Sequence, residues 1–345
     1  MQKIVECVPN FSEGRNTETI DAIAAAISAV QGVKLLNVDP DADYNRVVVT
    51  FVGEPDAVVD AAVAASAVAA ERIDMTTQKG EHPRMGATDV CPFIPVRGVT
   101  MEECVELSHR YGKRMAEELG IPVYLYAESA KEAKRVKMPS IRKGEYEGLA
   151  EKIVDPDWAP DYGKAEFNAK SGATVSGGRF FLIAYNINLL TPDVDVANDI
   201  AKRVRESGFL KKDEQGNKII GENGKALREP GLLKFTQGMG VELEAHGISQ
   251  VSMNLLRYPD TPMHAAFEEV RRLARERNTD TKGSELVGLV PLDCMLLSGR
   301  HYLAATGGNP ETATERELVE AAIEHLGLST LAPYVPEERI IEYML

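Results

Sequence analysis

The sequence predicts an α/β protein of the α+β type, built from two ferredoxin-like βαββαβ subdomains. Two observations predict this fold. Short apolar runs typical of strands alternate with longer runs of helical periodicity, and residues 1–96 and 180–291 show the same order of elements. The chain of 345 residues is also long enough for two subdomains. We therefore place an N-terminal subdomain at 1–180 and a C-terminal subdomain at 181–345.

The first half begins with a buried strand that Pro9-Asn10 ends. Asn16 or Thr17 can cap a helix whose isoleucines recur at helical spacing, and Gly32 ends that helix. The acidic segment 39–43 is interpreted as a turn-rich loop, because it combines Pro40 with three aspartates. The expected strands are 3–9, 33–38, 46–52, 89–96 and 121–126, and the expected helices are 17–30, 55–74 and 101–119.

The second half repeats this order. The expected strands are 180–188, 234–244, 248–256 and 284–291, and the expected helices are 192–207 and 261–277. Within it, residues 210–231 are polar and carry turn signals at Gln215-Gly216 and Asn223-Gly224, which predicts an inserted surface hairpin. The Gly-rich stretch 160–180 is interpreted as the boundary between the halves.

Charge and composition exclude several classes of function. The net charge of −14 disfavours nucleic acid and anionic membranes as main partners, since both require an excess of Lys and Arg. The N-terminus shows no apolar signal region and no segment has the length of a membrane span, which favours a cytoplasmic protein. The four cysteines lack zinc spacing. Asp39, Asp41 and Asp43 alternate as in a calcium loop but lack its Gly and Glu, so we expect no metal.

Two segments carry candidate functional side chains. His82 lies in a loop with glycines on both sides, and the charges of Glu81 and Arg84 could orient and tune its ring. It is either a catalytic acid/base or a surface or capping group. Asn10 follows the first strand, where open α/β sheets often bind ligands, but it could equally satisfy a turn. The glycines of 176–179 do not complete a dinucleotide-binding motif.

Long stretches of the chain resemble the formiminotransferase family. They include Val5-Glu-Cys-Val-Pro-Asn-Phe-Ser-Glu-Gly14, Lys79-Gly-Glu-His-Pro-Arg-Met-Gly86, Ile141-Arg-Lys-Gly-Glu-Tyr146, Ala184-Tyr-Asn-Ile-Asn-Leu-Leu190 and Leu286-Val-Gly-Leu-Val-Pro-Leu292. The resemblance covers nearly the whole chain. It implies two subdomains with folate lying between them, a homodimer, and a stand-alone bacterial transferase that works with a separate cyclodeaminase.

The resemblance also implies an activity: transfer of the formimino group from N-formimino-L-glutamate to N5 of tetrahydrofolate, in histidine degradation. Tetrahydrofolate, with a polyglutamate tail, would be a co-substrate, and no metal would be needed. His82 matches the family's catalytic acid/base. Asp39 is our candidate for holding the amidinium, and Arg84 is placed with the catalytic residues because it, Arg46 or Arg179 could bind substrate carboxylates.

The resemblance assigns folate binding to the segment 163–172, in which Gly163, Phe167 and Gly172 match the animal enzymes. We add Asn10, Gly177 and Gly178 as expected folate contacts. The full segment is Gly163, Lys164, Ala165, Glu166, Phe167, Asn168, Ala169, Lys170, Ser171 and Gly172.

Because folate polyglutamates are polyanions and the chain is acidic, we also expect a basic channel that uses Lys164, Lys170, Arg179 and Arg257. Other activities remain open at this stage. They are a formyltransferase that uses N-formylglutamate, a hydrolase that releases the formimino group to water, and a non-catalytic folate-binding protein.

Overall fold

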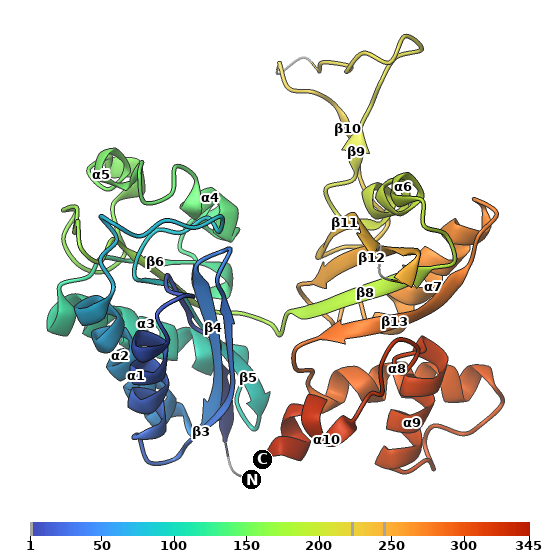
Figure 1. Ribbon diagram of the computed structural model, residues 1–345, viewed down its shortest axis with the longest axis horizontal. Coiled ribbons are helices and arrows are strands. Elements are labelled where there is room, and N and C mark those ends of the chain that lie inside the picture. The colour runs from blue at the N-terminus through green and yellow to red at the C-terminus, as the bar shows by residue number, and fades with distance from the viewer. Residues whose placement is uncertain (1–2, 222–223, 244–245) are drawn as a thin grey trace. The chain divides into compact units, whose positions relative to one another are not determined.

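The protein is described here by a computed structural model that covers residues 3–221, 224–243 and 246–345. It divides into two compact units, Met1–Phe180 and Phe181–Leu345. Each unit has its own sheet and helices (Figure 1).

The first unit contains a βαββαβ core. Its elements are β1 (Ile4–Cys7), β2 (Asn10–Phe11), α1 (Thr17–Ser28), β3 (Val33–Asp41), β4 (Arg46–Gly53), α2 (Pro55–Arg72) and β5 (Thr88–Arg97). Strand β4 pairs with β3 on one side and with β1 and β2 on the other, and β5 pairs with β1 and β2. All these pairings are antiparallel, which is the ferredoxin-like strand order.

Two parallel strands extend this sheet beyond β5. Helix α3 (Met101–Leu119) leads from β5 to β6 (Val123–Leu125), and the short helices α4 (Met138–Arg142) and α5 (Leu149–Lys152) precede β7 (Thr174–Gly178). Strand β7 lies between β5 and β6 and is parallel to both. Helix α3 begins with a capping box between Thr100 and Glu103 and ends at Gly120, whose φ of +66° suits a left-handed cap.

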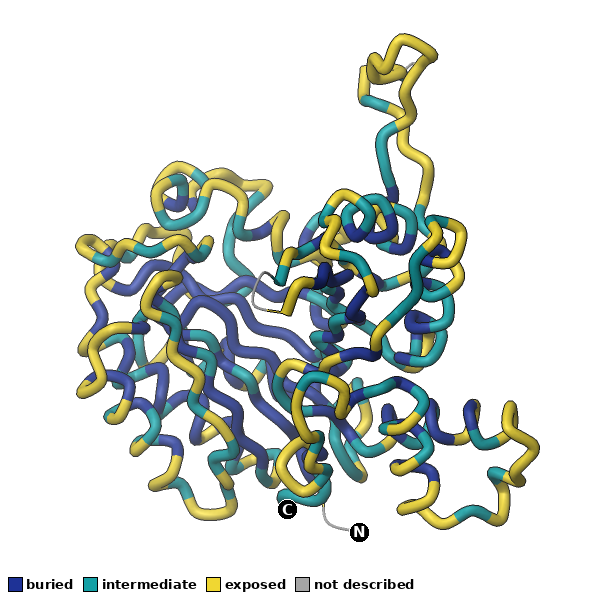
Figure 2. Tube along the Cα trace, turned by 45° about the vertical axis from the view of Figure 1, so that its right-hand side comes forward, coloured by how far each residue is buried: buried dark blue, intermediate teal, exposed yellow. Residues whose placement is uncertain are grey.

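The core of the first unit lies between the sheet and helices α1, α2 and α3, which cover one face of it (Figure 1). The strands contribute Phe11, Val47, Val49, Phe51 and Phe93 to this core, all with no exposed surface. Figure 2 shows these strands as the buried centre of the unit. A second cluster, centred on Met85, Tyr124 and Ile141, packs α4 and α5 onto the opposite face near β6 and β7.

The second unit repeats the topology. Its elements are β8 (Ile183–Leu189), α6 (Val194–Val204), β11 (Thr236–Leu243), β12 (Ile248–Leu255), α7 (Met263–Arg275) and β13 (Thr281–Val287), followed by α8 (Leu292–Ala305), α9 (Glu315–Leu326) and α10 (Pro336–Arg339). The strand order is β11-β12-β8-β13, with every pair antiparallel. The predicted pair of βαββαβ folds is therefore confirmed. Glu244, the end of the strand expected at 234–244, lies outside the described residues.

Two expectations about the first unit were wrong. The segment 39–43 is not a loop throughout, because β3 continues to Asp41 opposite Arg46 of β4. Strand β3 lies at the edge of the sheet and pairs only with β4. Proline, which has no backbone N–H, is tolerated there because no further strand needs a hydrogen bond from it. Strand β7 was not expected, because its glycines and serine resemble a loop in the sequence.

A hairpin rises from the second unit between α6 and β11 (Figure 1). Strands β9 (Phe209–Leu210) and β10 (Arg228–Glu229) form its base, and the Arg228 side chain donates to the carbonyls of Ser207 and Gly208. Beyond the base most of its described residues are exposed (Figure 2). The predicted turn residue Asn223 lies outside the described residues.

The hairpin tip should therefore contribute little to stability. Replacing residues 212–226 by Asn-Gly keeps the Lys211 amide bond to the Leu227 carbonyl and the Arg228 contacts. We expect the free energy of unfolding in urea to change by less than about 0.5 kcal/mol. A loss of several kcal/mol would show that the tip is part of the fold. A change of oligomeric state at unchanged stability would identify the tip as an interface arm.

Candidate functional site

Three segments of the first unit meet around the loop that carries His82. The Ser12 hydroxyl donates to the Gly86 carbonyl at 2.8 Å. The Asn45 amide donates to the Lys79 carbonyl at 2.8 Å, and its side-chain oxygen accepts from the Gly14 amide at 3.0 Å. The motif 10–14, the turn 42–45 and the loop 78–86, far apart in the sequence, are thus joined through one asparagine and one serine.

His82 is partly buried, and its Nε2 lies 2.9 Å from Nη1 of Arg46. Because a guanidinium can only donate, Nε2 is the acceptor and the imidazole is neutral. Burial and the positive charges of Arg46 and Arg142 lower the pKa of His82 from 6.5 to about 4. The ring of Tyr44 meets the imidazole edge to face, with centroids 6.0 Å apart. His82 is therefore a neutral imidazole whose unprotonated Nε2 accepts a hydrogen bond from the Arg46 guanidinium.

Asp39, Asn10 and Arg46 share one face of the sheet. Val48 of β4 lies opposite Asp39 of β3 and opposite Asn10 of β2. The side chains of Asp39, Val48 and Asn10 therefore project to the same side of the sheet. Arg46 is two residues before Val48 and projects with them. This is the face opposite α1, α2 and α3, because Val47 and Val49 point into the helical core. The predicted residues Asp39, Asn10 and His82 are thus gathered on the same side of the sheet through Arg46.

Arg142 and Asp89 form a second charged pair beside this group. Asp89 is 2% exposed, and it accepts from the Arg142 guanidinium at 2.5 Å and from the Met85 amide at 2.8 Å. Burial raises the pKa of Asp89, and the Arg142 charge opposes that shift. Neither residue, nor Tyr44, was predicted from the sequence as part of the site. The only signal for Arg142 and Asp89 was that each lies in a stretch that resembles the family, Ile141–Tyr146 for Arg142 and Asp89–Cys104 for Asp89.

Arg84 is surrounded by acidic side chains of the segment after α4. Its buried guanidinium donates to the Gln78 side chain at 2.8 Å and to both carboxylate oxygens of Glu147, at 2.7 and 2.8 Å, with Glu145 at 3.3 Å. The hydrogen bond with Glu147 raises the pKa of Arg84. Its donors are therefore used within the chain, and Arg84 ties the histidine loop to the segment after α4. A surface hollow of about 500 Å³ lies beside it, lined by Lys79, Gly80, Arg84, Gly144, Glu145 and Glu147.

The segment 163–172 is an exposed loop that ends on the histidine loop. Gly172 forms an antiparallel bridge with Gly86, and the Ala87 amide donates to the Ser171 carbonyl at 2.9 Å. Phe167 is 36% exposed, with its ring 5.5 Å from that of Tyr146. The two segments singled out in the sequence are thus in direct contact.

Gly177 and Gly178 of β7 have a structural reason to be glycines. A Cβ on Gly177 would lie 2.3 Å from the Tyr126 carbonyl oxygen, and one on Gly178 would lie 2.9 Å from the Val105 amide nitrogen of α3. Both residues are buried. Close packing of β7 accounts for them without a ligand.

The four residues of the expected basic channel are described by their local contacts. Lys164 is exposed, and Lys170 donates to the Glu71 carbonyl at 2.8 Å. Arg179 donates to the Phe180 carbonyl, and Arg257 pairs with Asp260 at 2.5 Å. The channel itself stays a prediction.

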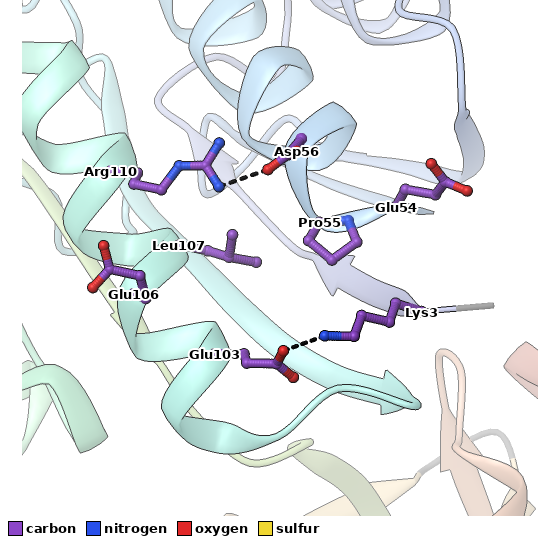
Figure 3. A pocket seen from close by; sticks show the side chains of 8 residues that line it. All are labelled: Lys3, Glu54, Pro55, Asp56, Glu103, Glu106, Leu107 and Arg110. Carbon is purple, nitrogen blue, oxygen red and sulfur yellow. Dashed lines mark hydrogen bonds and ion pairs between the residues drawn. The ribbon is translucent and has the colours of Figure 1, made fainter. Parts of the chain in front are cut away.

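A second surface pocket, of about 570 Å³, lies where α2 and α3 begin (Figure 3). Its lining is largely charged, with Arg110 bound to Asp56 at 2.6 Å and Lys3 bound to Glu103. Within the described residues, no cluster of three or more metal-binding side chains occurs. No helix in that part of the chain is long and apolar enough to cross a membrane.

The Gly86–Gly172 junction can be tested with a matched pair of glycines. Gly172 and Gly120 both have φ of +66°, but a Cβ on Gly172 would lie 2.1 Å from the Met85 carbonyl oxygen, whereas one on Gly120 meets nothing within 4 Å. Gly120→Ala should cost about 1–2 kcal/mol of stability for its left-handed backbone. Gly172→Ala should cost clearly more, as measured by urea unfolding. Equal losses would show that the junction tolerates a side chain.

The Arg84 contacts predict a structural effect. Arg84→Met should lower the free energy of unfolding by roughly 2 kcal/mol, because it removes several charge-assisted hydrogen bonds of the histidine loop. Glu147→Gln should cost less than about 1 kcal/mol, since the Glu147 side chain is 65% exposed. Unchanged stability of Arg84→Met together with a raised KM would instead make Arg84 a substrate ligand.

Comparison with known proteins places this chain in a family. Residues 4–179 match the model of the formiminotransferase domain, N-terminal subdomain, and residues 184–345 match that of the formiminotransferase domain. The formimidoyltransferase-cyclodeaminase of Dictyostelium discoideum is 49% identical over 345 residues, which is 100% of this chain and 61% of that protein.

Two shorter relatives are matched over nearly their whole length. The glutamate formimidoyltransferase of Streptococcus pyogenes serotype M1 is 41% identical, over 88% of this chain and 94% of that protein. The glutamate formimidoyltransferase of Thermoplasma acidophilum is also 41% identical, over 92% of this chain and 98% of that protein. The chain therefore belongs to the formiminotransferase family.

Proposed function

We propose that the protein is a glutamate formimidoyltransferase, which transfers the formimino group of N-formimino-L-glutamate to N5 of tetrahydrofolate in histidine degradation. One observation carries the proposal beyond family membership. His82 presents an unprotonated Nε2 beside a guanidinium, on the side of the sheet that also carries Asp39 and Asn10. A proton acceptor, a carboxylate and a cation are the groups that this transfer requires.

The reaction joins N5 to the formimino carbon and breaks the bond from that carbon to the glutamate nitrogen. The glutamate nitrogen leaves as an amine only if it gains a proton, and N5 must lose one. His82 takes the proton from N5 at Nε2 and returns it to the glutamate nitrogen, so that it ends the cycle unprotonated. Asp39, which is exposed, holds the cationic amidine group of the donor.

The segment 163–172 provides the folate contacts in this proposal. It is exposed over most of its length, and both ends are held, at Gly163 against Pro122 and at Gly172 against Met85. Phe167 offers an aromatic surface next to Tyr146, on which a planar ring system can stack. Asn10 belongs to the same group of contacts. Gly177 and Gly178 are not needed in it, because packing accounts for them.

Several further expectations stay predictions. They are the homodimer, the cytoplasmic location, the polyglutamate tail of the folate and the separate cyclodeaminase that would use the product.

The proposed role of His82 predicts a split between catalysis and binding. His82→Asn keeps an oxygen that can accept from Arg46 but cannot titrate near neutrality. It should lower kcat by about a hundredfold or more and change tetrahydrofolate affinity less than about tenfold. Because the neutral imidazole is the active form, kcat/KM of the unsubstituted enzyme should be lost only as the pH falls through about 4. Full kcat in the variant would remove His82 from the mechanism.

The assay itself separates the competing activities. Purified protein is incubated with N-formimino-L-glutamate, with and without tetrahydrofolate, and release of L-glutamate is measured. The proposal requires release only when tetrahydrofolate is present. Release without it would identify a hydrolase, and turnover of N-formylglutamate alone would identify a formyltransferase. Tetrahydrofolate binding without any turnover would leave a folate-binding protein.

A further inference from the structure

Arg46 stands out because its charge is not matched by an acid. Its Nη1 donates to His82, while its Nε is buried and has no hydrogen-bond partner. Among the described residues, no carboxylate lies within ion-pair distance of Arg46, whereas neighbouring Arg142 and Arg84 are both paired with acids. The guanidinium also lies over the Tyr44 ring, 6.0 Å from its centroid, so both of its partners are neutral. A partly buried guanidinium without an acidic partner is an incomplete site, because buried cations are normally paired.

The neighbouring charges do not complete it. Burial lowers the pKa of Arg46, Asp41 opposes that shift, and the positive charge of Arg142 reinforces it. Asp89 and Asp39 also oppose it, but Asp89 is bound to Arg142. The groups that act on His82 are Arg46 of β4, Arg142 of α4 and Asp41 of β3, with the Tyr44 ring at its edge. Arg142 already has Asp89 as its partner, so Arg46 is the cation beside the imidazole whose guanidinium a further carboxylate could pair.

We propose that Arg46 binds a carboxylate of the amino-acid donor and that this carboxylate, by taking over the guanidinium, releases His82 as a stronger proton acceptor. The inference rests on the proposed transferase function and deepens it. It assigns to one residue both recognition of the donor and control of the base.

The chemistry of the donor favours its α-carboxylate, rather than a carboxylate of the folate tail, as the group that Arg46 binds. In N-formimino-L-glutamate the α-carboxylate carbon is two bonds from the nitrogen that must be protonated. A group that delivers a proton to this nitrogen and a group that binds this carboxylate must therefore be neighbours, as His82 and Arg46 are at 2.9 Å. The carboxylates of the folate tail are separated from N5 by a whole aminobenzoyl unit.

The proposal also resolves a chemical difficulty. An imidazole with a pKa of about 4 is a poor base at neutral pH, since efficient proton transfer requires a pKa near the working pH. A carboxylate on Arg46 opposes the positive charge that lowers the His82 pKa, and so moves it back towards 6.5. The base would then reach full strength only when the donor is bound.

The test is an NMR titration of the histidines, with the His82 signal assigned by its loss in His82→Asn. In the unliganded protein His82 should titrate near 4, and Arg46→Gln should move that value towards 6.5. Saturating L-glutamate should raise it in the unsubstituted protein and leave it unchanged in Arg46→Gln. Calorimetry should show L-glutamate binding roughly tenfold to a hundredfold weaker in Arg46→Gln, with part of the affinity restored in Arg46→Lys.

The control is Arg110→Gln, which removes the same charge from α3, where Arg110 pairs with Asp56 (Figure 3). It should change neither the His82 titration nor glutamate binding. A second arm uses p-aminobenzoyl-L-glutamate, and a response to that compound but not to L-glutamate would assign Arg46 to the folate tail and overturn the proposal. An ordinary His82 titration that Arg46→Gln leaves unchanged would also overturn it.

These measurements involve no turnover. If L-glutamate raises the His82 titration through Arg46 but the transferase assay fails, the proposed function is rejected and the anion site is kept. The reverse result would keep the function and reject this role of Arg46.

Discussion

The arrangement of the candidate site depends on one constraint, the direct backbone contact between the histidine loop and the segments around it. Gly86 and Gly172 approach so closely that a Cβ on Gly172 would meet the Met85 carbonyl oxygen at 2.1 Å. The same loop is bound through Asn45 and Ser12 to two other segments. Backbone hydrogen bonds from Ser12 to Ala87 and from Ala87 to Ser171 add to these contacts, so the position of His82 is determined largely by the path of the chain.

This constraint explains why charged side chains can remain close together in the site. Arg142 and Asp89 are paired and Arg84 is neutralised by Glu145 and Glu147, whereas Arg46 donates to the neutral His82. A loop held by side-chain ion pairs alone could rearrange to match that charge. Here the loop is fixed, so the imbalance persists, and burial strengthens its effect on His82.

The two units share the βαββαβ topology but differ in what surrounds it. In the first unit β6 and β7 extend the sheet in parallel, and α4 and α5 pack on the face opposite the long helices. The second unit instead adds the hairpin between α6 and β11, and its chain continues through α8, α9 and α10. The groups brought together around His82 all come from the first unit. They lie on the face of the sheet that α1, α2 and α3 do not cover.

The sequence by itself determined the order of helices and strands within the two βαββαβ cores and the residue types at the site. Local signals suffice for this: β-branched runs such as 46–52, the isoleucine spacing of α1, and the Gly-flanked loop of His82. It could not determine that β7 is a strand, because Gly177 and Gly178 are required by Tyr126 and α3, which are distant in the sequence. Nor could it separate Arg84 from Arg46. Both are arginines near candidate residues, and only tertiary packing gave one of them acidic partners and the other an imidazole, because partners are chosen by proximity in space.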